Sequence, residues 1–184
     1  MRITGGAWVS RRIASPPKNA LVRPTPDALR EQAFGILGPR LAGSRFLDLF
    51  AGTGVNSLEA LSRGAARSVL VERAPATASL IRRNFAALGV PDDRWELLAC
   101  DARRALAALS ARGQSFDLVW CDPPFACWAE GPAALAAARE TGVLAPDAEI
   151  VLEAPPKADK AVPGFVVIRE LRGAFLLGVQ GGCC

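Results

Sequence analysis

The sequence predicts an α/β protein whose sheet is doubly wound and mostly parallel, with an antiparallel strand pair at its C-terminal end. Short apolar runs alternate with helical segments between residues 45 and 154, and most of these helical segments end at a glycine. The last two apolar runs, by contrast, follow one another without a helix between them. Because strands separated by helices of this length form βαβ units, we expect the central strands to be parallel and the final two to be antiparallel.

The N-terminal segment, residues 1–24, is rich in glycine, proline and arginine and contains the short β-like pieces MRIT, AWVS and RRIA. We interpret it as a short basic arm or β-hairpin. No internal repeat, low-complexity tract or flexible linker divides the rest of the chain. Residues 25–184 are therefore predicted to form a single domain, with enough apolar material for a core of its own.

The stretch RPTPDALREQAFGIL predicts the first helix of that domain. Thr25 is a favourable N-cap, Pro26 suits the first helical position, and Asp27 is favourable in the first turn because a helix N-terminus carries partial positive charge. Apolar residues at helical spacing then mark the buried face: Leu29, Ala33, Phe34 and Leu37.

After this helix the chain alternates between strand and helix. Strands are expected at RFLDLF, SVLVE, RWELLA, FDLVWC and AEIVLEA, and helices at VNSLEALSRG, APATASLIRRNFAALG, DARRALAALSARG and GPAALAAARETG. Glycine closes such helices because it tolerates the left-handed conformation. In FVVIRELRGAFLLGV two strands are expected, joined by a turn at Gly173.

The composition excludes several kinds of chemistry. Histidine is absent, which removes histidine general bases, Ser–His nucleophile pairs and histidine-ligated metals. The five cysteines match no zinc-binding spacing, and their odd number argues against a disulfide framework. The chain has neither a membrane-spanning apolar run nor the apolar stretch of a secretory signal. We therefore expect a cytoplasmic monomer, without metal or membrane association, that works through carboxylates, backbone groups or a cofactor.

Positive charge is concentrated at the N-terminal end. Residues 1–45 carry a net charge of +6, although the whole chain carries only +4. A basic segment on a nearly neutral body indicates a polyanionic partner, nucleic acid first, whereas the plain alternative is a solubilising surface. The side chains expected to contact nucleic acid are Arg2, Arg11, Arg12, Lys18, Arg23 and Arg30.

Four consecutive strands are followed by a glycine loop or an acid, at the sheet edge where α/β proteins bind ligands. The loop DLFAGTG comes after the first of these strands. Its Gly52 and Gly54 allow a tight turn and the close approach of a ligand at a helix N-terminus. Glu72 lies 18 residues further on, where a carboxylate can accept hydrogen bonds from a ribose diol. Asp101 and the tetrapeptide DPPF, residues 122–125, follow the next two strands. Each feature alone has an ordinary structural explanation, but together they predict a nucleoside-containing cofactor lying across the strand ends.

The type of cofactor is indicated by a resemblance. A dinucleotide-binding loop would place a third glycine where Ser57 stands. The pattern D-x-F-x-G-x-G followed by D-P-P-F instead resembles the S-adenosylmethionine-dependent methyltransferases that modify exocyclic amino groups. With RPTPDALREQAFGIL and the opening MRITGGAWVSRRI, the chain is similar over most of residues 1–125 to the bacterial family that methylates guanine N2 in small-subunit ribosomal RNA. The resemblance implies a Rossmann-like class I methyltransferase sheet, with ribosomal RNA or a partly assembled small ribosomal subunit as partner.

The resemblance also implies roles for individual residues. The residues implied around the methionine part of S-adenosylmethionine are Asp48, Gly52, Thr53 and Gly54. Glu72 would bind the ribose hydroxyls, while Asp101 and the backbone of Ala102 would face the adenine. The N-terminal side of the pocket would be formed by Arg23, Pro24 and Thr25.

The tetrapeptide DPPF suits transfer to an exocyclic amine, whose lone pair is delocalised into the ring. Hydrogen-bond acceptors aimed at the amine favour the tetrahedral geometry that attack requires and stabilise the charge that grows on nitrogen. Asp122 can supply one acceptor and the backbone carbonyl of Pro123 the other, because proline fixes φ. Phe125 can stack on the base and recover part of the cost of unstacking it. The structural alternative is a strand stop whose phenylalanine covers the edge of the core.

Two other functions remain open. An adenine-N6 methyltransferase of DNA or RNA would use the same tetrapeptide, although no target-recognition insert for a sequence-specific DNA enzyme is apparent. The second open function is a non-catalytic RNA- or nucleotide-binding module. The intact Asp122 and Phe125 argue against it.

Overall fold

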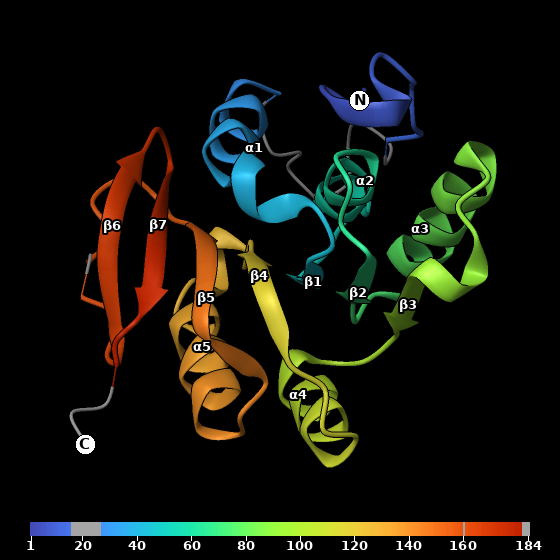
Figure 1. Ribbon diagram of the computed structural model, residues 1–184. Helices are drawn as coiled ribbons and strands as arrows, with labels where there is room; N and C mark the ends of the chain where they lie inside the picture. The colour runs from blue at the N-terminus through green and yellow to red at the C-terminus, as the bar shows by residue number, and fades with distance from the viewer. Residues whose placement is uncertain (16–26, 160, 182–184) are drawn as a thin grey trace.

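In a computed structural model of the chain, residues 1–15, 27–159 and 161–181 are described. They form one seven-stranded sheet with the strand order β3-β2-β1-β4-β5-β7-β6, shown in Figure 1. The first five strands pair in parallel, and β7 pairs antiparallel with both β5 and β6. The predicted fold class is confirmed: the sheet is doubly wound, mostly parallel and closed at one edge by an antiparallel strand pair.

The elements follow the predicted alternation. The strands are β1 (Arg45–Leu49), β2 (Arg67–Val71), β3 (Trp95–Leu98), β4 (Phe116–Cys121), β5 (Leu144–Glu153), β6 (Phe165–Leu171) and β7 (Ala174–Val179). The helices are α1 (Asp27–Leu41), α2 (Val55–Ser62), α3 (Pro75–Leu88), α4 (Ala102–Ala111) and α5 (Glu130–Glu140), with short 3-10 turns η1 (Gly6–Trp8), η2 (Asp92–Arg94) and η3 (Phe125–Cys127).

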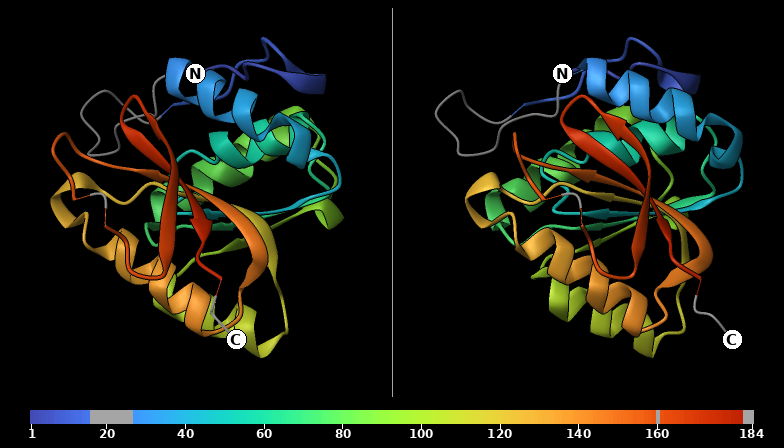
Figure 2. Two further views of the ribbon diagram at one scale, coloured as in Figure 1. Left: turned by 60° about the vertical axis from the view of Figure 1, so that its left-hand side comes forward. Right: turned by 90° about the vertical axis from the view of Figure 1, so that its left-hand side faces the viewer.

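Two hydrophobic layers cover the two faces of the sheet. On one face, α1, α2, α3 and the N-terminal segment pack over residues such as Phe46, Leu70 and Trp120. On the other face, α4 and α5 pack over residues such as Leu47 and Val119. Both views in Figure 2 show this division, with the N-terminal segment and α1 on the side away from α4 and α5. The carboxyl ends of the parallel strands remain uncovered by either layer and are free to form a site.

The helix α1 runs further than its apolar pattern indicates. It continues through Pro39 to Leu41, whose side chain is buried. Proline inside a helix removes a hydrogen bond and crowds the carbonyl of the residue four positions before it. Here that residue is Gly35, at which an added Cβ would meet no neighbouring element within 4 Å. The predicted start of α1 at Thr25 and Pro26 lies outside the described residues.

The N-terminal arm is a compact turn fastened to α2 and α3. Its two ends pair through an isolated antiparallel bridge between Arg2 and Arg12. The expectation of a β-like AWVS is wrong, because Ala7 and Trp8 belong to η1 and Ser10 takes a positive φ of 67°. Gly6 approaches the backbone of α2 so closely that a Cβ there would lie 1.9 Å from a carbonyl oxygen, which favours a turn over a strand.

Buried polar side chains hold this arm in place. The fully buried carboxylate of Glu59 on α2 accepts hydrogen bonds from the backbone and hydroxyl of Thr4 and pairs with Arg63 at 2.8 Å. Asn84 on α3 bonds to both the N–H and the carbonyl of Ala14, and also donates to the carbonyl of Thr53 in the glycine loop at 3.0 Å. The arm is thereby connected directly to the loop that follows β1.

Candidate active site

A cavity of about 1220 Å³ opens at the carboxyl ends of the parallel strands. Five consecutive strands contribute a wall residue at or just beyond their ends: Gly52, Glu72, Asp101, Asp122 and Glu153. The turn between β6 and β7, near Gly173, closes the side away from the glycine loop. The volume exceeds the ~300–1,000 Å³ typical of small-molecule sites. It is large enough for two ligands to lie side by side.

The glycine loop after β1 adopts left-handed conformations. Gly52 and Gly54 have φ values of 54° and 76°, and Phe50 takes a φ of 64°. Such a conformation is unusual for phenylalanine and is retained mainly where surrounding structure enforces it, often at functional sites. Gly54 also approaches α3 and β2 closely, since a Cβ there would lie 3.0 Å from the ring of Phe85. The backbone conformation therefore favours glycine at both positions, and at Gly54 the close packing also leaves no room for a side chain.

Glu72 fastens the glycine loop to the start of α3. Its Oε2 accepts a hydrogen bond from the N–H of Gly52 at 3.0 Å, and its Oε1 accepts from the N–H of Ala74 at 2.7 Å. The side chain is on the cavity wall, so a hydroxyl donor entering the cavity would meet a carboxylate already oriented by two backbone groups. The predicted pair of glycine loop and acid is brought together.

Asp48 lies behind this wall and does not line the cavity. The side chain is fully buried, and its Oδ2 accepts hydrogen bonds from the N–H and the hydroxyl of Ser57 at 3.1 and 2.8 Å. Its Oδ1 has no hydrogen-bond partner among the described residues. Burial raises the pKa of Asp48 from 3.8 to about 8; the Ser57 bonds oppose the rise and the charges of Glu153 and Glu72 add to it. In the protein alone this carboxyl therefore titrates near neutral pH.

This raised pKa gives a testable dependence of stability on pH. Between pH 4 and pH 8 the unfolded state ionises Asp48 while the folded state keeps the proton, so stability falls as the pH rises. Asp48→Asn cannot ionise, and we expect it to be more stable than the wild type by about 2–5 kcal/mol at pH 8 and by less at pH 5. Urea unfolding of both proteins at the two pH values measures the difference. An equal difference at pH 5 and pH 8 would contradict the assignment.

Two further predicted residues of the loop are also set back from the cavity. Thr53 is buried, and its hydroxyl lies 3.7 Å from the sulfur of Met1 in the arm. Gly54 serves the turn and the packing against α3. The structure thus places Gly52 on the wall and Thr53 and Gly54 in the layer that supports it.

The third strand end carries both of its predicted residues on the wall. Asp101 and Ala102 line the cavity beside Cys100. The carboxylate of Asp101 also accepts a hydrogen bond from the N–H of Arg104 at 2.9 Å, which makes it the N-cap of α4. Capping and facing the cavity are compatible, because a carboxylate has several acceptor sites.

The tetrapeptide DPPF lines the same cavity at the end of β4, which is separated from the strand of Glu72 by β1. The ladder between β1 and β4 continues to Asp122, whose N–H donates to the carbonyl of Leu49 at 3.2 Å. Pro123 is buried against Gly131 of α5, where a Cβ would lie 2.7 Å from the proline ring. Phe125 is 44% exposed at the cavity wall. A carboxylate, a buried proline and an accessible aromatic ring therefore follow one another at the cavity.

Glu153, at the end of β5, is a candidate site residue that sequence reasoning missed. It lines the cavity but is only 5% exposed. Its Oε1 accepts a hydrogen bond from the indole N–H of Trp120 at 3.0 Å, and its carbonyl accepts from Trp128 at 3.2 Å. The signal was available: the fifth strand, like the second, third and fourth, is followed or ended by an acid.

The predicted nucleic-acid contacts divide into three groups. Arg11 and Arg12 are exposed on the arm, and Arg2 is exposed and pairs with Asp27 at 3.4 Å. Arg30 is a correction, because it is fully buried in α1, where it donates to the carboxylate of Asp27 and the carbonyl of Arg2. A buried guanidinium cannot reach a phosphate in this conformation. Lys18, Arg23 and Thr25, with Pro24, lie outside the described residues.

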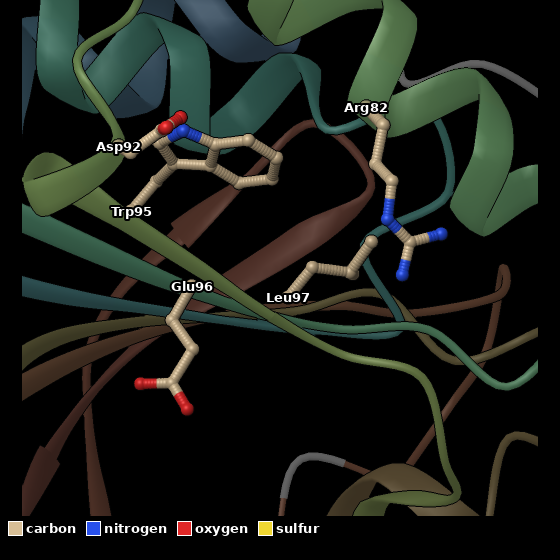
Figure 3. Close-up of a pocket in the computed structure, with 5 residues that line it drawn as sticks. All are labelled: Arg82, Asp92, Trp95, Glu96 and Leu97. Atoms are coloured by element: carbon tan, nitrogen blue, oxygen red, sulfur yellow. The ribbon is translucent and has the colours of Figure 1, made fainter.

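A second, smaller depression of about 240 Å³ lies along β3, the edge strand furthest from β6. Figure 3 shows Trp95 and Glu96 on opposite sides of the strand, with Arg82 approaching from α3. Trp95 packs on Phe85 with ring centroids 4.3 Å apart, and Glu96 pairs with Arg67 and Arg112. These contacts give Trp95 and Glu96 a structural role.

The described part of the chain shows neither a metal site nor a membrane-spanning helix. Its residues include no group of three or more histidine, cysteine, aspartate or glutamate side chains that could hold a metal ion. None of its helices has the length and apolar character needed to cross a bilayer. The thiol of Cys121 is buried, and burial raises its pKa well above 9.0, so it behaves as a packing residue.

Comparison with known proteins identifies relatives over most of the chain. A family model described as "Conserved hypothetical protein 95" matches residues 1–173. The protein named "Ribosomal RNA small subunit methyltransferase D" from Escherichia coli is 37% identical over 125 residues, which cover 68% of this chain and 60% of that protein. "Putative rRNA methyltransferase YlbH" from Bacillus subtilis is 34% identical over 125 residues, 68% of this chain and 67% of that protein.

A solved structure agrees with the whole fold. The structure described as "Putative methyltransferase yhhF from Escherichia coli" superposes with a TM-score of 0.81 at 30% identity, covering 100% of this chain and 99% of that chain. The likeness therefore includes the C-terminal strands β5, β6 and β7, which carry Glu153 and the far wall of the cavity. The sheet is that of the Rossmann-like methyltransferases.

Proposed function

This chain belongs to the Conserved hypothetical protein 95 family, and on that basis we propose that it transfers a methyl group from S-adenosylmethionine to the exocyclic N2 amine of a guanine in small-subunit ribosomal RNA. The partner is ribosomal RNA or a partly assembled small ribosomal subunit, and the protein acts as a cytoplasmic monomer. Relatives named as ribosomal RNA methyltransferases support the reaction class, although the match covers 60% of the Escherichia coli protein.

One observation carries the proposal: a single cavity joins the glycine loop and Glu72 on one side to Asp122 and Phe125 on the other. A nucleoside cofactor bound at the first pair would point its far end at the second pair, because ligands of such sheets lie across the strand ends. A donor and a methyl acceptor can then meet in one space.

The residues present fit S-adenosylmethionine. Glu72 is oriented to accept from ribose hydroxyls, and Asp101 and Ala102 are on the wall where the adenine would lie. Asp48, whose Oδ1 lacks a partner among the described residues and whose pKa is raised, would be stabilised in its ionised form by a nearby cation. The cofactor is such a cation, since it carries a sulfonium and an ammonium group. Thr53 and Gly54 hold the loop against α3 and the arm.

When bound, S-adenosylmethionine supplies an electrophilic methyl group whose bonding electrons remain on sulfur after transfer. Asp122 and the carbonyl of Pro123 accept hydrogen bonds from the target amine and stabilise the positive charge that develops on its nitrogen. The close packing of the Pro123 ring on Gly131 holds the residue that carries that carbonyl in place. Phe125 presents its accessible ring to the face of the unstacked base. The proton released from nitrogen passes to Asp122 or to water.

The direct test is transfer of labelled methyl to small ribosomal subunits from a bacterial strain that lacks its own copy of this gene. Nucleosides from the labelled RNA are separated and identified by mass spectrometry. We expect N2-methylguanosine as the sole new product. Formation of N6-methyladenosine would show instead that the protein is an adenine-N6 methyltransferase. Binding of RNA without binding of S-adenosylmethionine would show that it is a non-catalytic module.

The arm is proposed to grip RNA phosphates through Arg11 and Arg12. Replacing both with alanine is expected to weaken RNA binding about 3- to 30-fold at low salt and to reduce the slope of log K against log salt by about 1–2, because two phosphate contacts are lost. Filter binding at several salt concentrations measures both quantities. The matched control is Arg103→Ala with Arg104→Ala, an equal loss of charge from exposed residues of α4 on the opposite face of the sheet. An equal effect of the two double variants would exclude the arm as a specific contact.

A further inference from the structure

Glu153 is a carboxylate that the reaction described above does not use. It comes from β5, lines the cavity and is 5% exposed. Its charge adds to the raised pKa values of Asp48 and Cys121, which lie behind the wall. A carboxylate on the wall of a binding cavity can accept hydrogen bonds from a ligand as well as from the protein, because it has several acceptor sites.

The register of the sheet places Glu153 beside Asp122. In the parallel pair of β4 and β5, Cys121 is opposite Leu152, so the next residues of the two strands are neighbours. Adjacent strands lie about 4.8 Å apart, and side chains alternate between the two faces. Trp120, two residues before Asp122, donates its indole N–H to Glu153. The carboxylates of Asp122 and Glu153 therefore project to the same face of the sheet.

The side chain of Glu153 is held rigidly from behind. The indole of Trp120 is fully buried and stacks on Phe34 with centroids 5.2 Å apart and planes 13° apart. Trp128 fixes the backbone of Glu153 through its carbonyl. A carboxylate positioned by two tryptophans is suited to recognise a ligand, since little further ordering of the side chain is needed on binding.

Two carboxylates side by side match one edge of guanine better than any edge of adenine. Carboxylates only accept hydrogen bonds. Guanine presents two neighbouring donors, N1–H and the N2 amine, whereas the N6 amine of adenine lies next to N1, an acceptor. With Asp122 on the amine, a second carboxylate on the N1 side attracts guanine and repels adenine.

We propose that Glu153 accepts a hydrogen bond from guanine N1–H and thereby selects guanine, while Asp122 accepts from the N2 amine. Glu153 thus determines base specificity and does not take part in the transfer itself. The inference rests on the proposed function, because it requires a guanine base in the cavity.

The test compares guanine with 2-aminopurine at the target position, once that nucleotide has been located. The analogue keeps the 2-amino group but has a lone pair in place of N1–H. It also lacks O6, so the informative quantity is the guanine/2-aminopurine ratio of kcat/KM in each protein. For the wild type we expect a preference for guanine of about 10- to 100-fold. In Glu153→Gln, which retains an acceptor for Trp120 and can turn an amide donor to N1, the ratio should fall to within about threefold of unity.

Two more variants separate specificity from structure. Glu153→Asp keeps the carboxylate and is expected to keep the preference for guanine. Glu130→Gln removes a charge from the same cavity, where Glu130 pairs with Arg73 at 3.6 Å, and should also keep the wild-type ratio. A purely structural role for Glu153 would lower transfer to both bases in proportion.

The outcomes are distinct. A wild-type ratio near unity, or an undiminished ratio in Glu153→Gln, overturns the role of Glu153 and leaves guanine methylation intact. The wild-type measurement stands even if Glu153→Gln does not fold. Failure of the wild type to methylate the guanine substrate overturns the proposed function and, with it, the inference.

Discussion

Asp122→Ala is expected to lower kcat for methyl transfer by about 100- to 1,000-fold, while the dissociation constant for S-adenosylmethionine changes by less than about threefold. In the proposed reaction the carboxylate contacts the target amine, whose charge grows as the methyl is transferred. Its interaction therefore strengthens mainly in the transition state, and its loss should appear in kcat.

Single-turnover transfer with saturating RNA, together with calorimetric titration of the cofactor, measures both quantities for Asp122→Ala. Asp93→Ala in η2 is the matched control, because it removes an exposed aspartate at the opposite edge of the sheet. Asp122→Asn should be impaired as well, since its amide can present a donor toward the amine. Full activity in Asp122→Ala would show that the amine is positioned by other groups.

Glu72→Gln is expected to weaken cofactor binding by about 10- to 100-fold. Glu72 accepts from two backbone N–H groups. We propose that it also accepts from the ribose hydroxyls, so one substitution would affect both the loop and the ligand. Hydrogen bonds to charged acceptors contribute about 1.5–3 kcal/mol, which corresponds to this range of affinity.

A cofactor analogue separates the two effects of Glu72. Calorimetry with S-adenosylhomocysteine and its 2′-deoxy form gives the energy of the ribose contact in each protein. The wild type should lose affinity for the deoxy analogue, whereas Glu72→Gln should bind the two forms more nearly alike. If both proteins lose the same affinity on removal of the hydroxyl, Glu72 acts on the loop and does not bind the ribose.

Much of the fold could be predicted because local signals and global topology agree. Alternating apolar and helical segments, with glycines such as Gly89 in the left-handed conformation at a helix end, specify βαβ units almost without reference to the rest of the chain. The antiparallel end followed from the same logic, because the turn at Gly173, with φ of 96°, leaves no room for a crossover helix.

The predictions that were wrong or incomplete concern residues whose environment depends on distant parts of the chain. Counting charge treats every arginine alike, but Arg30 lies on the side of α1 that meets the arm, and its burial depends on the carbonyl of Arg2. The turn at Gly6 is set by contact with α2, which no property of AWVS reveals. Glu153 was overlooked because one acid at the end of an apolar strand is common, and only the register beside Asp122 gives it meaning.

The set-back position of Asp48, Thr53 and Gly54 has a related cause. The motif identifies the loop, but the direction of each side chain depends on how α2 and α3 pack beneath it. Gly52 is turned to the cavity and its two successors to the core. The proposed part of Thr53 and Gly54 in cofactor binding is therefore to hold the loop in shape, whereas Asp48 is proposed to act through its charge from behind the wall.

The central claim is geometric, and a crystal structure with bound sinefungin, whose amine stands where the transferable methyl would be, tests it most directly. We predict that the ribose contacts Glu72 and that the amine points toward Asp122, leaving about 5–6 Å between them for one amino nitrogen. An inhibitor bound outside this cavity, or with its amine directed away from Asp122, would contradict the account.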